Sequence, residues 1–130
     1  MSPILLVLAI HGATLGTGDD CYQGATTQMA MDKCAAQDLE AANSKLATFT
    51  KSYETRLTPE KLSLFRSAQV SWEQFRQSNC KFEASSVASG SVYPEVLDRC
   101  LAERARSRLS ELESLSNCKD GDYVCPTDGT

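Results

Sequence analysis

The sequence predicts an all-α protein: a three-helix antiparallel bundle with an N-terminal arm and a C-terminal tail, stapled by disulfides. Three observations predict this fold. Apolar side chains recur every three or four residues along three long stretches, which is the period of one helix face. The break between the first two stretches is short, so those helices should be antiparallel neighbours. Finally, the chain contains six cysteines, all after residue 18.

The first helix is predicted over residues 27–56. Thr26 or Thr27 precedes it as a candidate N-cap, because a hydroxyl can accept a hydrogen bond from the first free backbone N–H groups. Tyr53 closes its apolar stripe, and we expect this ring to pack in the core with its hydroxyl at the edge. The full stripe consists of Ala35, Leu39, Ala42, Leu46, Phe49 and Tyr53.

The second helix should begin at Thr58-Pro59-Glu60, since a threonine cap, proline in the first turn and an early acid are all start signals. It should end near Glu83. We interpret Trp72 and Phe75 as core residues, and we expect Arg76 to stack on Trp72 or to pair with an internal acid. The predicted stripe runs through Leu62, Phe65, Gln69, Trp72, Phe75 or Arg76, and Asn79.

The third helix is predicted over residues 94–115, after a loop over residues 84–93 that is rich in serine and has Gly90 as its turn point. Arginines, including Arg106, are expected on its solvent-exposed faces. Its stripe consists of Leu97, Leu101, Ala105, Leu109 and Leu112. Residues 118–130 have no apolar period and form the tail.

The six cysteines allow fifteen pairings in principle. Cys80 and Cys100 flank the second interhelical loop, so a bridge between them would close it. The same local argument pairs Cys21 with Cys34, which folds the arm onto the first helix, and leaves Cys118 with Cys125 in the tail. Metal binding is the alternative, but these spacings match no zinc signature, and no metal site is predicted.

Residues 1–18 are interpreted as a signal peptide, with the helical domain over 19–116 and the disulfide-closed tail over 117–130. The apolar run Ile4–Ile10 is too short to span a bilayer and is followed by small residues, so no stable membrane insertion is expected after cleavage. Cleavage after Ala13, Gly16 or Gly18 would fit. A buried N-terminal strand is the alternative, because no Lys or Arg precedes the run.

Charge and composition exclude several functions. The net charge of −4 is a poor match for nucleic acid and suits a basic protein partner. The only histidine, His11, lies in the signal segment, which removes the usual general base, the nucleophilic triads and a common metal ligand. We therefore predict no catalytic residues, no enzyme activity and no cofactor. A glycosidase carboxylate pair drawn from Glu40, Glu73, Glu83, Glu95 and Glu103 is the alternative, but we interpret these as solvated helix faces.

An ordered set of residues resembles the LprI-like lysozyme inhibitor N-terminal domain family of small exported bacterial proteins. The shared positions are Thr27-Gln28, Cys34, Leu46, Tyr53, Gln69, Trp72, Phe75-Arg76, Cys80, Gly90-Ser91, Cys100 and Arg106. The resemblance covers about residues 21–112. One departure is Gln77, where the family usually has Asp, and the Cys118–Cys125 tail looks like an addition.

This resemblance implies a helical domain outside the cytoplasm, periplasmic or secreted, that binds a protein, plausibly a basic lysozyme. Inhibitors of lysozyme commonly insert a loop into the sugar cleft. The loop between the second and third helices is the candidate contact, through Glu83, Ser89, Gly90, Ser91 and Tyr93. The alternatives are an immunity or envelope-stress protein that binds another hydrolase, and a structural envelope domain. A solvated connection is the other interpretation of the loop itself.

Overall fold

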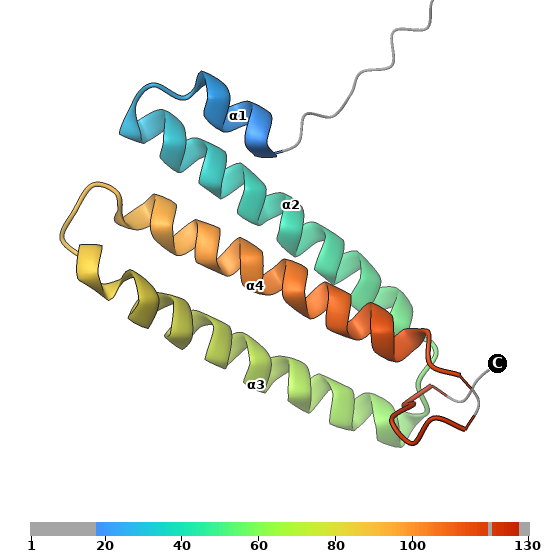
Figure 1. The fold of residues 1–130 in the computed structure, drawn as a ribbon. Coiled ribbons are helices and arrows are strands. Elements are labelled where there is room, and N and C mark those ends of the chain that lie inside the picture. Colours follow the sequence, from blue (N-terminus) through green and yellow to red (C-terminus); the bar gives the residue numbers. More distant parts are fainter. Residues whose placement is uncertain (1–17, 120, 128–130) are drawn as a thin grey trace, which may run out of the picture.

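The computed structural model describes residues 18–119 and 121–127 (Figure 1). It consists of α1 (Gly18–Gly24), α2 (Gln28–Glu54), α3 (Pro59–Glu83), the 3-10 turn η1 (Ala84–Val87) and α4 (Tyr93–Ser116). The described residues contain no strand, so the predicted all-α bundle is confirmed. Residues 1–17, which hold His11 and almost all of the expected signal peptide, lie outside the described part of the chain.

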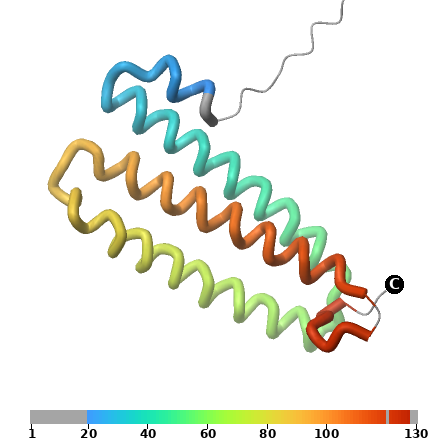
Figure 2. Tube along the Cα trace, viewed as in Figure 1, coloured from blue at the N-terminus to red at the C-terminus, as the bar shows by residue number. Residues whose placement is uncertain are grey.

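The three long helices run up, down and up, so each is antiparallel to the next along the chain (Figures 1 and 2). The most extensive packing is nevertheless between α2 and α4, which run in the same direction side by side. Helix α3 packs on α4 over a smaller area, and only Arg76 and Cys80 of its residues are buried. Much of the surface of α3 therefore faces solvent.

Small side chains bring α2 and α4 together. Ala102 and Ala105 of α4 are completely buried, and Ala42 of α2 belongs to the same core cluster. Leu46 and Leu112 complete the fully buried part of that cluster, because the alanines leave room for larger neighbours to interdigitate. Partly buried side chains close its edges, namely Leu39, Phe49, Phe65, Trp72, Leu109 and Leu115.

Both predicted helix starts are confirmed. The hydroxyl of Thr27 accepts a 3.2 Å hydrogen bond from the backbone N–H of Ala30, and that of Thr58 accepts one of 3.4 Å from Lys61. Each cap satisfies a backbone donor that has no partner inside its own helix. Pro59 then occupies the first turn of α3, where its missing N–H costs nothing.

The N-terminal arm contains a short helix, α1, that the sequence pattern did not predict. Its Cys21 is bonded to Cys34 of α2, and Figure 1 shows α1 folded back along the start of that helix. Seven residues are too few to show an apolar period, and α1 is held by this disulfide and by packing rather than by propensity. The prediction that a bridge folds the arm onto the first long helix is confirmed.

Two expectations about aromatic residues are wrong in part. Phe75 is 58% exposed, so it is not a core residue, and the buried position on this turn of α3 belongs to Arg76. The two residues are about 100° apart on the helix, and the buried face is centred closer to Arg76. Tyr53 is 2% exposed as predicted, but its hydroxyl is buried, with no hydrogen-bond partner among the described residues, rather than placed at the edge. Burial accordingly raises the pKa of Tyr53.

Candidate functional site

The candidate site is the connection between α3 and α4, residues 83–93, which we call the tip. Its backbone is a series of tight turns: Ala88 N–H donates to the Ser85 carbonyl over 3.3 Å, and Gly90 N–H donates to the Val87 carbonyl over 2.8 Å. Tyr93 N–H then donates to the Gly90 carbonyl over 3.2 Å. The segment predicted as a loop is thus folded on itself, with η1 as its first turn.

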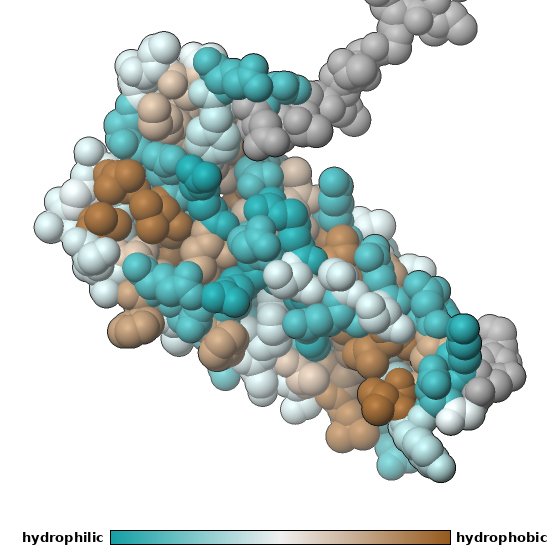
Figure 3. All heavy atoms as spheres, in the orientation of Figure 1, coloured by the Kyte–Doolittle hydropathy of each residue, from teal (hydrophilic) through white to brown (hydrophobic). Residues whose placement is uncertain are grey.

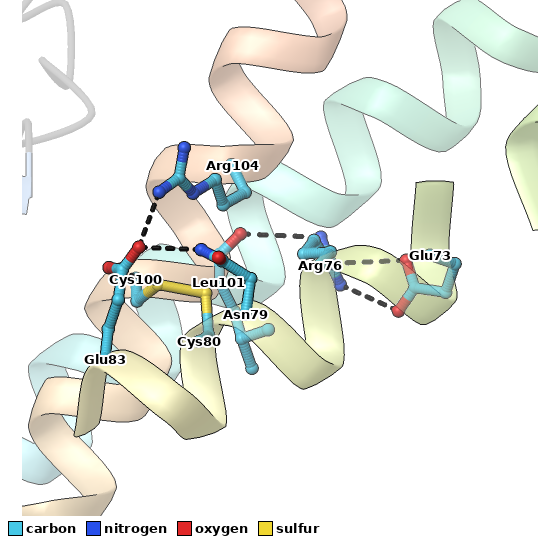
Figure 4. Close-up of a disulfide and its surroundings, with 8 residues drawn as sticks. All are labelled: Glu73, Arg76, Asn79, Cys80, Glu83, Cys100, Leu101 and Arg104. Carbon is cyan, nitrogen blue, oxygen red and sulfur yellow. Dashed lines mark hydrogen bonds and ion pairs between the residues drawn. A yellow bond between two sulfur atoms is a disulfide. The ribbon is translucent and has the colours of Figure 1, made fainter. Parts of the chain in front are cut away.

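A disulfide holds the base of the tip. Cys80 near the end of α3 is bonded to Cys100 of α4, with their Cα atoms 5.6 Å apart (Figure 4). Cys80 and Ala84 are completely buried, so the chain leaves α3 through the interior before it turns outward. The predicted closure of this connection by Cys80 and Cys100 is confirmed, and the third pair, Cys118 with Cys125, closes the tail as predicted.

Glu83 braces this base from the solvent side. Its carboxylate accepts a 2.6 Å hydrogen bond from the guanidinium of Arg104 on α4 and a 2.7 Å hydrogen bond from the amide of Asn79 (Figure 4). The hydrogen bond from Arg104 holds the pKa of Glu83 below its usual value. Glu83 therefore joins α3 to α4, and a partner that reached this point would meet a neutralised pair rather than an isolated negative charge.

The outer residues of the tip are small, polar and exposed. Ser89, Gly90 and Ser91 all face solvent, whereas Tyr93 is half-buried where α4 begins. A Cβ placed on Gly90 would approach the Val87 carbonyl oxygen to 3.3 Å, so the absence of a side chain keeps this turn tight. The tip can therefore offer backbone groups and hydroxyls on a series of tight, solvent-exposed turns.

A polar cluster lies on α4 just beyond the tip. Glu95 is buried and accepts hydrogen bonds from Gln28 of α2 over 3.0 Å and from Arg99 over 3.1 Å. The Arg99 guanidinium also lies over the ring of Tyr22, 5.1 Å from its centroid. Asp98 lies nearby, in a place that disfavours its ionised form. Burial, and secondarily the charge of Asp32, raise the pKa of its carboxyl. These contacts join α1, α2 and α4 beneath the site.

Arg76 is the buried cation that the sequence pointed to, and both of its predicted roles occur. Its guanidinium carbon lies 5.1 Å from the centre of the Trp72 ring, and the side chain forms an ion pair with Glu73 at 3.3 Å. Arg108 of α4 approaches the same indole at 5.8 Å and donates a 2.8 Å hydrogen bond to Gln69. At the Gln77 position that departs from the family pattern, the side-chain amide donates to Glu73 over 3.0 Å.

An open groove of about 420 Å³ follows this network between α2 and α3. Leu46, Trp72 and Arg76 contribute to its lining, and Thr50 places a buried hydroxyl there that has no hydrogen-bond partner among the described residues. Two of its glutamates, Glu54 and Glu73, are paired with arginines of the same molecule. The structure therefore places the predicted contact residues in the tip at one end of the bundle, and Gln69, Trp72 and Arg76 in this groove along its side.

Arg106 lies outside both places and joins α4 to α2. Its guanidinium pairs with Asp38 at 2.9 Å and with Glu103 at 3.1 Å. Asp38, the partner of Arg106, and Asn43, the partner of Arg76, were missed by the sequence reasoning, which followed apolar positions. Their only sequence signal is that each is polar and lies within one or two residues of a stripe position. Gln28, the partner of Glu95, was identified only as a position shared with the family.

The described residues present no group of three histidine, cysteine, aspartate or glutamate side chains placed to hold a metal ion. Within the same residues, no helix combines the length and apolarity needed to cross a membrane. What the described geometry does present is a disulfide-stapled helical bundle with a tightly turned, solvent-exposed tip. Disulfide bridges of this kind are typical of small domains in oxidising compartments.

Comparison with known proteins places this bundle in a family. The sequence profile described as lysozyme inhibitor LprI matches residues 19–112, which spans α1 to most of α4, and the chain belongs to that family. The chain is also similar to an uncharacterized protein of Rhizobium meliloti (strain 1021), with 29% identity over 109 residues, 74% of this chain and 78% of the relative. No solved structure matches it significantly.

Proposed function

We propose that this protein acts outside the cytoplasm as a lysozyme inhibitor, with the tip inserted into the sugar-binding cleft of the enzyme. The family membership supports the class of activity. The observation that carries the site is the build of the tip: Ser89, Gly90 and Ser91 are exposed on tight turns, and the Cys80–Cys100 disulfide fixes their base. A rigid segment loses little conformational entropy on binding, which favours affinity.

Steric occlusion is the proposed mechanism. A cleft that accepts a polysaccharide is concave and lined with hydrogen-bonding groups, so an exposed turn with hydroxyls and backbone groups is suited to enter it. The net charge of −4 would assist encounter with a basic lysozyme, and this contribution should weaken as salt is added. No catalytic step by the inhibitor itself is needed.

Localisation in the periplasm or outside the cell accompanies this proposal. All six cysteines pair in the structure, and such bonds persist in oxidising compartments. Residues 1–18 would act as the signal peptide that takes the chain there. A mature chain found in the reducing cytoplasm, with free thiols, would contradict this part of the proposal.

The direct test measures residual muramidase activity of c-, g- and i-type lysozymes with the oxidised protein added in increasing amounts at low salt. Ser91→Arg should abolish inhibition, because a large side chain at the exposed tip cannot enter a cleft already filled by the tip. Ser63→Arg, at an exposed serine in the first part of α3, adds the same charge and bulk far from the tip and should leave inhibition unchanged.

Equal loss of inhibition in both variants would show that the tip is not the contact. Full activity of all three lysozymes at a large excess of the wild-type protein would overturn the lysozyme proposal. In that case an immunity or envelope-stress role against another hydrolase, or a structural role in the envelope, would remain as the alternatives.

A further inference from the structure

The outer face of α3 carries an apolar seam that the bundle does not use. Its members are spaced by four, three, four, three and four residues, so they share one face of the helix. Leu64, Phe75 and Phe82 are respectively 67%, 58% and 77% exposed, and the three small members between them are exposed as well. The seam consists of Leu64, Ala68, Ser71, Phe75, Ser78 and Phe82.

Large and small side chains follow one another along this seam in the order large, small, small, large, small, large. Phenylalanines mark its C-terminal half, whereas Leu64 and two small residues form its N-terminal half. None of the six side chains is charged. Figure 3 shows hydrophobic residues at intervals along the edge of the molecule where α3 runs, with more hydrophilic residues between them. Such a face on an exposed helix is typical of a surface that packs against another helix.

An apolar pocket of about 310 Å³ adjoins the N-terminal end of the seam. Leu64 and Ala68 line one side of it, and the opposite side is formed by Leu112 and Leu115 of α4 with Pro126 of the tail. The protruding Phe82 lies at the other end of the same helix, more than four helical turns away. One surface thus carries both a projecting aromatic ring and a hollow lined by apolar groups.

We propose that this face binds a second copy of the chain, with the two α3 helices antiparallel about a two-fold axis. In that register Leu64 faces Phe82 of the second copy, Ala68 faces Ser78, and Ser71 faces Phe75. Each phenylalanine near the axis therefore meets a small serine, and each Phe82 comes to the pocket beside Leu64 of the other copy. The two-fold axis repeats every contact, as an isologous interface requires.

The observations favour a second copy over an unrelated partner because the surface is complementary to itself. The pocket lies beside Leu64, at one end of the seam, and the Phe82 ring projects at the other end. The ring of one copy reaches the pocket of the other only when the two α3 helices pair in opposite directions. The seam is about 27 Å long at 1.5 Å per residue, and the two Phe82 contacts extend it onto α4. An interface of this extent is at the small end of specific ones, so we expect dissociation at roughly micromolar concentration.

The dimer is independent of the proposed inhibition. The seam ends at Phe82, and the tip begins immediately after it, so antiparallel pairing sends the two tips toward opposite ends of the assembly. A protein that dimerises without touching lysozyme would support this inference and contradict the proposed function. A protein that inhibits lysozyme but stays monomeric would support the proposed function and contradict this inference.

Sedimentation equilibrium over roughly 1–200 µM tests the proposal. The wild-type oxidised protein should shift from monomer toward dimer across this range. Phe82→Lys and Leu64→Glu should each remain monomeric, because each places two unpaired charges against apolar groups of the other copy. The double variant L64E/F82K should regain the dimer, because the register brings the introduced carboxylate of one copy opposite the introduced ammonium of the other.

Val70→Ser is the matched control. Val70 is 60% exposed on the same helix but lies well off the seam, so its removal should leave dimerisation unchanged. The far-ultraviolet circular dichroism of every variant reports whether the helices remain folded. A wild-type monomer throughout the range, dissociation by Val70→Ser equal to that by Phe82→Lys, or a monomeric L64E/F82K variant would overturn the proposal.

Discussion

Arg76 of α3 donates a 2.8 Å hydrogen bond to the side-chain oxygen of Asn43 on α2. The same guanidinium donates a longer bond, 3.4 Å, to the Leu101 carbonyl of α4, and only 5% of the residue is exposed (Figure 4). One buried cation therefore contacts all three long helices. Because α3 buries few apolar side chains, the hydrogen bonds of Arg76 are an important part of what holds α3 against α2 and α4.

Arg76→Lys should destabilise the protein although it preserves the charge. A lysine ammonium cannot present the planar fork that reaches Asn43, Glu73 and the Leu101 carbonyl together, so hydrogen bonds to buried and partly buried acceptors are lost. We expect the free energy of unfolding to fall by about 2 kcal/mol, as measured by urea denaturation at neutral pH. Arg104→Lys, at an exposed ion pair, should cost well under 1 kcal/mol. Equal losses in the two variants would contradict the special role of Arg76.

Removal of the disulfide at the tip should act on both stability and function. The double variant C80S/C100S frees a loop of twenty residues, which should lower the free energy of unfolding by about 3 kcal/mol in a chain-entropy model. Unfolding of part of the protein would by itself raise the apparent inhibition constant. If the tip is the inhibitory segment, the constant should rise by more than this loss of folded protein accounts for. Removal of Cys118 and Cys125 by serine substitution is the control, since it should leave inhibition intact.

Asp98→Asn should stabilise the protein at neutral pH. Burial, with the neighbouring Asp32 charge, raises the pKa of Asp98 above its ordinary 3.8, so the folded state disfavours the ionised carboxylate. That penalty is fully present above the folded-state pKa and disappears as the pH falls below 3.8, where both states are protonated. The stability advantage of the variant, measured by thermal unfolding from about pH 7 to about pH 3, should therefore shrink with acid. An advantage independent of pH would refute this cause.

Much of the fold could be predicted because apolar periodicity, helix caps and cysteine positions are local signals. The stripe through Leu46 and Tyr53 and the caps at Thr27 and Thr58 all appear where the sequence placed them. The exposure of Phe75 could not be predicted, since Phe75 and Arg76 are adjacent and the stripe fits either. Only the position of α4 relative to α3 decides which of them is buried.

The candidate site was less predictable than the fold. The sequence located the tip through Gly90 and the flanking cysteines, but it left Glu83 as a free acid. Its engagement by Arg104 depends on how far α4 lies from α3, a distance that no local pattern reports. The apolar seam along Leu64 and Phe82 was also missed, because the search for a buried stripe on this helix followed a different face and counted Phe75 as part of the core.

Trp72 and Phe75 should differ sharply in their contributions to the folded monomer. Trp72 packs against the core cluster between two guanidinium groups, so Trp72→Ala should lower the free energy of unfolding by about 2–3 kcal/mol. Phe75→Ala removes an exposed ring and should change it by less than about 0.5 kcal/mol. Urea titrations at about 1 µM or below, where the proposed dimer is dissociated, make the comparison. Similar losses would mean that Phe75 packs in the monomer.

The Glu83–Arg104 pair should make the base of the tip sensitive to acid. The hydrogen bond from Arg104 lowers the pKa of Glu83 below 4.5, so the pair stabilises the folded state above that pH. This contribution is lost as the pH falls through the lower, folded-state pKa. Glu83→Gln should therefore be less stable than the wild type at about pH 7 and nearly equal to it near pH 2. Glu40→Gln, at an exposed glutamate of α2, provides the control, and a similar pH profile for both substitutions would show that Arg104 does not hold the tip through Glu83.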